Sequence, residues 1–147
     1  MERIVVTAAA IWREGELLLA QRRPGSHLAG MWEFPGGKLE IDEAPEEGLK
    51  REIKEELNID IHILGLATVV WHRYEDRVVL LLVYHCQLQA GEPQGMEGQA
   101  IGWFSPKAAL DLELAPADRT ILENIINGGP GFEQPAFTAQ TGTYPVV

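Results

Sequence analysis

Residues 36–59 read GGKLEIDEAPEEGLKREIKEELNI and contain the clearest helix of the sequence, which we expect over residues 44–57. Pro45 suits the first turn of a helix, where a backbone N–H has no partner within the helix in any case. Asn58 follows the segment as a residue that tolerates the left-handed conformation at a helix end. Four side chains recur at every fourth position and predict one buried stripe: Pro45, Leu49, Ile53 and Leu57.

A second face of this helix is acidic. Glu52, Glu55 and Glu56 stand at spacings i, i+3 and i+4, so their carboxylates share one side and repel one another by about 0.2–0.5 kcal/mol per pair. Gly48 lies one turn before Glu52 and costs about 1 kcal/mol relative to alanine in a helix interior. A hard divalent cation would remove the repulsion, because it takes oxygen ligands. The alternative is a solvated acidic surface.

The residues around the acidic face favour the metal site. Gly36 and Gly37 permit a sharp turn and a close approach to a ligand just before the helix. Glu43 lies near the start of the helix. The guanidinium of Arg51, four residues from both Glu47 and Glu55, could orient a carboxylate through two hydrogen bonds.

The spacing of these residues resembles the Nudix box. Gly37, Glu43 and the segment Arg51–Ile59 match its pattern at every position except Asn58, which replaces the usual glycine. Because Asn adopts the left-handed conformation more readily than most residues, we expect the helix end to be kept. Further segments from about residue 4 to about residue 126 are similar to the MutT branch of this family, which removes oxidised nucleotides such as 8-oxo-dGTP. They include residues 21–23, 27, 32–38, 74–77 and 91–99.

The resemblance implies a set of metal ligands and a catalytic base. Members of the family bind Mg²⁺, or Mn²⁺ in its place, and attack the β-phosphorus of a nucleoside triphosphate with water. Glu52 is the first candidate for the general base and Glu97 the second. Gly37, Glu43 and Arg51 correspond to structural positions of the motif. The implied ligands are the carbonyl of Gly36 and the carboxylates of Glu52, Glu55, Glu56 and Glu97.

The resemblance also implies substrate contacts, each with a simpler alternative. Arg23 and Lys38 match positions near the phosphates, but each could be a surface residue. His27 and Phe34 match positions near the nucleoside, but His27 could lie on a loop surface and Phe34 in the core. Asp118 stands where MutT has an asparagine that reads the oxidised purine. A carboxylate accepts well from the exocyclic amine of cytosine, or Asp118 could cap the last helix.

The rest of the chain predicts an α/β protein with a mixed sheet, and the resemblance makes it a Nudix fold, an α/β/α sandwich. We expect one domain over residues 1–127 and a Gly/Pro-rich tail over 128–147. Pro35–Gly37 should break regular structure, Ser105 should cap a short helix, Trp32 should lie near the site, and Trp12, Trp71 and Trp103 should lie in the core or pack on strands. Strands are expected at 4–12, 17–20, 32–34, 59–71, 77–88 and 101–104, and a further helix at 116–127.

Composition restricts the partners. The formal net charge of the 147 residues is −10, the reverse of what proteins that grip polymeric nucleic acid show. There is one cysteine, no apolar run of membrane-spanning length and no secretory signal, so we expect a cytoplasmic protein, either a monomer or a homodimer. A small nucleotide is the expected ligand, with a cation to offset the acidic field.

Three functions follow in order of preference. The first is hydrolysis of an oxidised purine nucleotide such as 8-oxo-dGTP to the monophosphate and pyrophosphate. The second is the same chemistry on CTP, dCTP or modified cytosine nucleotides, because Leu114–Asp118 also resembles the CTP pyrophosphohydrolase branch. The third is a regulatory Nudix domain that binds a nucleotide without cleaving it. The intact set of Glu52, Glu55 and Glu56 favours catalysis over the third.

Overall fold

One mixed sheet organises the protein in the computed structural model, which describes residues 1–128. The strand order is β3-β2-β1-β6-β5, while β4 pairs with β1 and β7 with β2. β1 and β6 run parallel, and the other pairs are antiparallel. The strands are β1 (Glu2–Arg13), β2 (Glu16–Gln21), β3 (Trp32–Glu33), β4 (Gly36–Lys38), β5 (Asp60–Arg73), β6 (Arg77–Ala90) and β7 (Ile101–Phe104).

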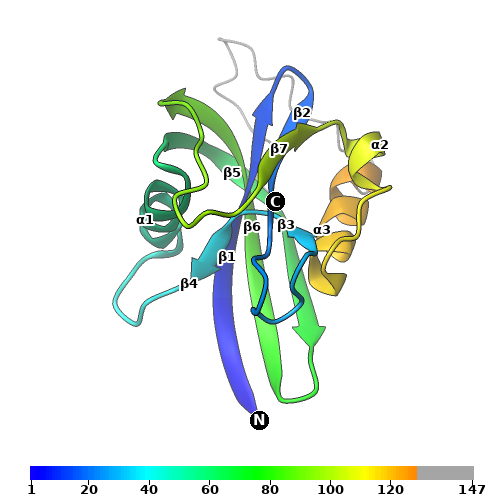
Figure 1. Ribbon diagram of the computed structural model, residues 1–147. Helices are drawn as coiled ribbons and strands as arrows, with labels where there is room; N and C mark the ends of the chain where they lie inside the picture. Colours follow the sequence, from blue (N-terminus) through cyan, green and yellow to red (C-terminus); the bar gives the residue numbers. More distant parts are fainter. Residues whose placement is uncertain (129–147) are drawn as a thin grey trace.

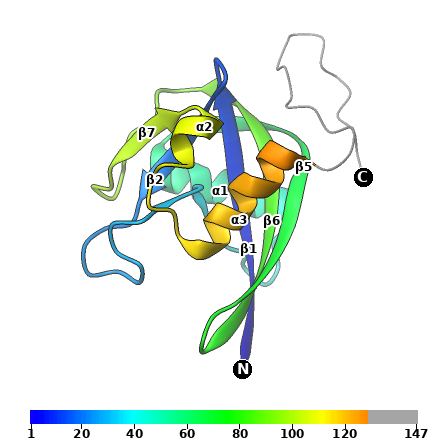
Figure 2. The same cartoon turned by 90° about the vertical axis from the view of Figure 1, so that its right-hand side faces the viewer.

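Helices cover both faces of this sheet, as Figures 1 and 2 show. α1 (Pro45–Leu57) lies on one face, and α2 (Pro106–Ala109) and α3 (Pro116–Asn127) lie on the other. β1 therefore contributes to two cores: Ala8 and Trp12 pack toward α3, while Ala9 and Ile11 pack toward α1. A strand buried on both sides reads as a continuous apolar run. The predicted sandwich with a mixed sheet is confirmed.

α1 begins and ends where the sequence predicts. The Glu47 carboxylate accepts a hydrogen bond from the Ala44 N–H at 3.1 Å, which satisfies a donor at the helix start. Asn58 is left-handed, with φ 56° and ψ 40°, and its N–H donates to the Lys54 carbonyl. Leu49, Ile53 and Leu57 of the predicted stripe are fully buried. The short helix α2 is also capped as predicted, because the Ser105 hydroxyl accepts from the Ala108 N–H at 3.1 Å.

Two expectations about individual segments are wrong. Gly36 and Gly37 do not end regular structure but form β4 with Lys38, antiparallel to β1. A side chain at Gly36 would place its Cβ 2.7 Å from the Ala8 Cα, so only glycine lets these strands approach so closely. Trp71 is 60% exposed rather than packed, whereas Trp12 is 4% exposed and lies in the core. Trp103 is partly buried against the α1-side core.

Two further predictions concern the membrane and the tail. Among residues 1–128, no helix is both long enough and apolar enough to span a bilayer. The predicted tail over 128–147 lies outside the described residues apart from Gly128, which follows α3 in the left-handed conformation. The single cysteine, Cys86, is buried on β6.

His85 on β6 makes folding sensitive to acid. Its side chain is fully buried, and its Nδ1 accepts a hydrogen bond from Trp12 Nε1 at 2.9 Å. Burial lowers the pKa of His85 from 6.5 to about 4. Between these values the unfolded chain binds a proton that the folded chain does not, so stability is retained above pH 6.5 and lost as the pH falls toward 4.

We expect His85→Gln to remove this dependence, because an amide can accept from Trp12 without titrating. Relative to the variant, the wild type should lose about 2–3 kcal/mol of unfolding free energy between pH 7 and pH 4.5. Urea unfolding at the two pH values measures the difference. His62→Gln, on an exposed position of β5, is the control and should follow the wild type. Equal losses of unfolding free energy in the wild type and in His85→Gln would contradict this prediction, because they would show that His85 binds the proton in the folded protein as well.

Candidate active site

A cavity of about 330 Å³ opens between the end of α1 and the start of α3, beside the glycine strand β4. Its floor is apolar, formed by Val6, Ala8, Phe34 and Leu81. Its polar lining is charged and of both signs. The acidic lining residues are Glu33, Glu56, Glu97 and Asp118, and the basic ones are Arg22, Arg23 and Lys38. An apolar floor beneath convergent charged groups is typical of a small-molecule site.

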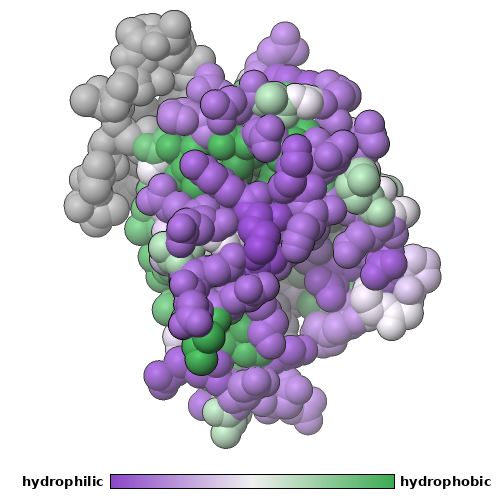
Figure 3. Space-filling view, turned by 90° about the vertical axis from the view of Figure 1, so that its left-hand side faces the viewer, coloured by the Kyte–Doolittle hydropathy of each residue, from purple (hydrophilic) through white to green (hydrophobic). Residues whose placement is uncertain are grey.

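The three helix glutamates share one face of α1 but have different surroundings. Glu56 lines the cavity, and its Oε2 is buried without a hydrogen-bond partner. Glu52 and Glu55 lie outside the cavity lining, with side chains 21% and 54% exposed. Around α1 the molecular surface is mostly hydrophilic, as Figure 3 shows. The structure therefore brings Gly36, Glu56 and Glu97 of the expected ligands to the cavity.

Arg51 forms hydrogen bonds with Glu52 and Glu55 on α1 and also links the preceding loop to this helix. Its Nε and NH2 donate to both carboxylate oxygens of Glu43, at 2.5 and 2.8 Å. Its NH1 donates to Glu52 at 3.0 Å and to Glu55 at 3.1 Å. The hydrogen bond from Arg51 lowers the pKa of Glu43 to about 2. The expected bidentate contact thus exists, but Glu43 receives it, while Glu47 bonds to Ala44 instead.

Two glycines create the space for this arrangement. A Cβ on Gly37 would lie 2.5 Å from Glu52 Oε2, so the Glu52 carboxylate rests directly on the β4 backbone. A Cβ on Gly48 would lie 2.6 Å from a Leu39 methyl group and 3.0 Å from Glu43. The mid-helix glycine therefore leaves room for the loop before α1. This close packing accounts for a residue that is unfavourable in a helix interior.

Burial and crowding make Glu56 a weak acid in the metal-free protein. Desolvation is the main cause, with further contributions from Glu52, Glu33 and Glu97, and together they raise its pKa to about 8. The cavity donors are hard oxygens, which suit Mg²⁺ or Mn²⁺. Within the described part of the chain, no three acidic, histidine or cysteine side chains converge closely enough to hold a metal ion. Glu52 and Glu55 would have to turn from Arg51 to join Glu56.

Asp118 links α3 to the cavity floor. It is 8% exposed, and its Oδ1 accepts a hydrogen bond from the Phe34 backbone N–H at 2.8 Å. Desolvation raises the pKa of this carboxyl to about 8. Ala115, not Asp118, occupies the N-cap position of α3, so the cap alternative is wrong. Phe34 lies in the core, as one of its two predicted positions requires, and it also lines the cavity floor; its contact with a nucleoside stays a prediction.

The basic residues differ in their surroundings. Arg23 is exposed at the rim, and its NH1 lies 3.4 Å from the Glu97 carbonyl oxygen. Lys38 is exposed and lines the same cavity. Arg22 is half-buried and donates to Glu33 at 2.9 Å. The Arg22–Arg23 pair is therefore split, with one member neutralising an acid inside the cavity and the other facing solvent.

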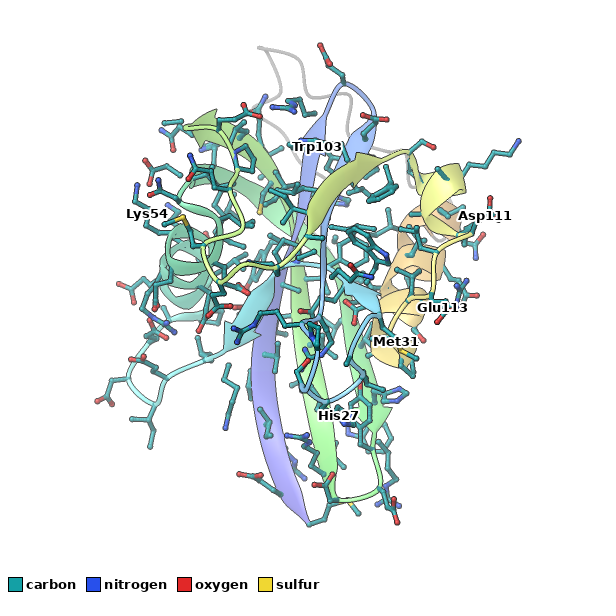
Figure 4. All side chains as sticks on the ribbon, viewed as in Figure 1. His27, Met31, Lys54, Trp103, Asp111 and Glu113 are labelled. Carbon is teal, nitrogen blue, oxygen red and sulfur yellow. The ribbon has the colours of Figure 1, made fainter. Side chains whose placement is uncertain are left out.

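His27 and Trp32 lie apart from the main cavity. His27 is on the loop after β2 (Figure 4) and lines a second hollow of about 180 Å³ that shares Arg22, Glu33 and Asp118 with the first. Its ring meets Tyr74 edge to face, 5.8 Å between centroids. Trp32 packs edge to face on Phe104 on the α3 side, at 5.1 Å, and does not line the cavity.

Several polar cavity residues were not predicted as part of the site, among them Glu33, Gln99 and Thr7. Glu33 adjoins the glycine segment, and its charge within a short strand was a usable signal. Gln99 was part of a matching segment without an assigned role. Thr7 is fully buried with its hydroxyl unpartnered, and an alanine-rich strand gave no indication that it faces a cavity.

Comparison with known proteins gives consistent matches. The NUDIX domain family matches residues 7–124. The CTP pyrophosphohydrolase of Escherichia coli (strain K12) is 42% identical over 84% of this chain and 91% of that protein. The 8-oxo-dGTP diphosphatase of Haemophilus influenzae is 33% identical over 86% of this chain and 94% of that protein. A crystal structure of a MutT NUDIX hydrolase from Burkholderia pseudomallei aligns with a TM-score of 0.78 and 34% identity, covering 85% of this chain and 99% of that one.

Proposed function

The chain belongs to the Nudix family, and from this premise we propose that it hydrolyses a nucleoside triphosphate to the monophosphate and pyrophosphate. The observation that carries the proposal is the cavity, which Glu56 of the box helix lines together with Glu97, three basic residues and an apolar floor. A regulatory domain would not need Glu52, Glu55 and Glu56 all present on one face of α1.

The proposed reaction is attack of water on the β-phosphorus. The bond between the β-phosphorus and the oxygen that bridges the α- and β-phosphorus atoms breaks. The monophosphate keeps that bridging oxygen, and pyrophosphate gains the oxygen of water. A divalent metal, which Nudix hydrolases generally use and which we propose to be Mg²⁺, would be held by Gly36, Glu56 and Glu97 at the cavity, where it would neutralise phosphate charge and lower the pKa of a bound water. Arg23 and Lys38 stand at the rim, where a triphosphate would extend.

Two carboxylates are candidates to take the proton from water. Glu52 lies against Arg51, which orients its carboxylate and offsets part of the burial that raises the pKa of Glu52. Glu97 lines the cavity directly and needs no rearrangement to face a bound phosphate. Glu56, which of the three helix glutamates is the one that lines the cavity, is suited to hold the metal, because a cation would supply the partner that its Oε2 lacks.

The inner cavity supports recognition of a base. A neutral Asp118 offers one O–H donor and a carbonyl acceptor, the complement of the N3 and N4 edge of cytosine. The relative with CTP in its name, at 42% identity, supports the same choice. The second candidate is an oxidised guanine nucleotide, supported by the relative named 8-oxo-dGTP diphosphatase. The Hoogsteen edge of the oxidised guanine likewise carries one hydrogen-bond donor beside one acceptor.

A substrate panel tests the proposed function. We expect pyrophosphate and a monophosphate as products, in the presence of Mg²⁺, from at least one of CTP, dCTP and 8-oxo-dGTP. The preferred substrate should exceed undamaged dGTP in kcat/KM by at least about tenfold, because a site that hydrogen-bonds a base edge rejects a mismatched edge. Release of inorganic phosphate alone, or no turnover of any triphosphate, would contradict the proposal.

A further inference from the structure

The loop between β6 and β7 is attached to the end of the helix that carries the acidic face. The Gln94 N–H donates to the Leu57 carbonyl and the Met96 N–H to the Glu56 carbonyl, each at 3.0 Å. The last four carbonyls of an α-helix have no partner within the helix. This loop satisfies two of them and is thereby fixed relative to α1.

Gln99 ties the same helix end to Glu97. Its side-chain Nε2 donates to the Glu56 carbonyl at 3.2 Å, and its Oε1 accepts from the Glu97 backbone N–H at 2.8 Å. One amide group thus connects Glu56, on the cavity side of α1, with Glu97, the acid that the loop places at the cavity. Only Asn and Gln side chains offer a donor and an acceptor in this form, and Asn is one methylene shorter.

The packing around this amide leaves little slack. A Cβ on Gly95 would lie 3.1 Å from Gln99 Oε1, so the loop folds tightly over the side chain. The Glu97 carbonyl is also held, by Arg23 NH1 at 3.4 Å. Gln99 lines the cavity together with Glu56 and Glu97 but presents both of its polar atoms to the protein.

We propose that Gln99 is a positioning residue, which sets the distance between Glu97 and Glu56 by bridging the loop and the end of α1. This inference rests on the proposed function, because it gives Glu97 a role at the metal and phosphates. The coupling works through the backbone of both acids, and it positions Glu97 as a metal ligand whether or not Glu97 also takes the proton from water. When a group at the reaction centre is displaced by only about 1 Å, the reaction rate can fall by about a hundredfold.

Gln99→Met tests the bridge, because methionine keeps the length and removes both hydrogen bonds. We expect kcat to fall by about 10- to 100-fold with a smaller change in KM, as for other residues that orient a ligand. Gln94→Met is the matched control: it lies in the same loop, its side chain is exposed, and only its backbone bonds to α1. This control should retain wild-type kcat.

A double-mutant cycle with Glu97→Gln separates positioning from a general effect on folding. If Gln99 acts through Glu97, then Gln99→Met should change kcat less than twofold when Glu97→Gln is already present. Mn²⁺ affinity, titrated without nucleotide, should show the same loss for either single variant and no further loss for the pair. Independent, additive losses would overturn the proposal.

Amide hydrogen exchange provides a readout that requires no turnover. The Glu97 amide should exchange at least tenfold faster in Gln99→Met, while the buried amides of β1 keep their protection. Unchanged exchange at Glu97 would overturn the bridge. If exchange and Mn²⁺ affinity respond as expected but the wild type cleaves no triphosphate, the proposed function fails and the structural coupling stands.

Discussion

Glu56→Gln is expected to lower kcat/KM by about 10³-fold or more while making the metal-free protein more stable. The loss of rate follows from removing the charged oxygen ligand that we propose for the metal, since single electrostatic groups at such centres contribute factors of 10²–10³ and proton-transfer groups up to about 10⁴. Because Gln has the same shape, the cavity should keep its volume.

The gain in stability has its origin in the pKa of about 8 that burial and neighbouring acids give Glu56. A carboxyl whose folded pKa is raised stabilises the fold fully below its unfolded pKa, and this contribution is lost as pH rises through the folded value. At pH 8 the wild type therefore carries a cost that a neutral amide does not. We expect Glu56→Gln to gain about 1–3 kcal/mol of unfolding free energy there, without metal.

Chemical unfolding with and without Mg²⁺ measures both effects in one experiment. Mg²⁺ should stabilise the wild type and leave Glu56→Gln nearly unchanged. Glu52→Gln should also lose turnover but gain less stability, because the Arg51 hydrogen bond already compensates part of the burial of Glu52. Glu46→Gln, exposed in the first turn of α1, is the control for both. Wild-type turnover in Glu56→Gln would reject its role as a ligand.

The features that sequence predicted well are governed by neighbouring residues. Pro45, the four-residue stripe and Asn58 act within one helix, so its limits could be predicted to within a residue. The nearly continuous apolar run over residues 4–12 likewise predicted the strand β1, which is buried on both faces. The fold class then followed from the order of these elements and from the resemblance.

The features that sequence missed depend on distant parts of the chain. β4 has no apolar alternation and exists because Gly36 fits against Ala8 of β1. The strand pattern around Trp71 indicates its side of the sheet but not where the covering helix ends, and Trp71 lies exposed. Arg51 contacts Glu43 because the loop before α1 folds against Gly48. The bridge through Gln99 required α1 and a loop forty-three residues later to meet.

Asp118→Leu is expected to collapse the preference among bases, lowering the ratio of kcat/KM between the preferred nucleotide and undamaged dGTP by about 10²-fold or more. The substitution removes the inner polar group at the cavity floor, where no other carboxyl bonds to Phe34. It also leaves the Phe34 N–H without its acceptor, which costs about 1–3 kcal/mol. A comparison of two nucleotides on one protein preparation cancels that loss, since misfolding lowers both rates equally.

Asp118→Asn distinguishes base reading from bracing. The amide can still accept from Phe34 and, like a neutral carboxyl, offers both a donor and an acceptor to a base. At pH 7, below the Asp118 pKa of about 8, the variant should keep the wild-type preference within a few fold. At pH 9 the wild-type carboxylate has lost its donor, so its preference should fall while that of Asp118→Asn persists. Because the ratio compares two triphosphates at the same pH, titration of the glutamates on α1 cancels. An unchanged ratio in Asp118→Leu would mean that Asp118 only braces Phe34, and the base would have to be read by Glu33 and its neighbours.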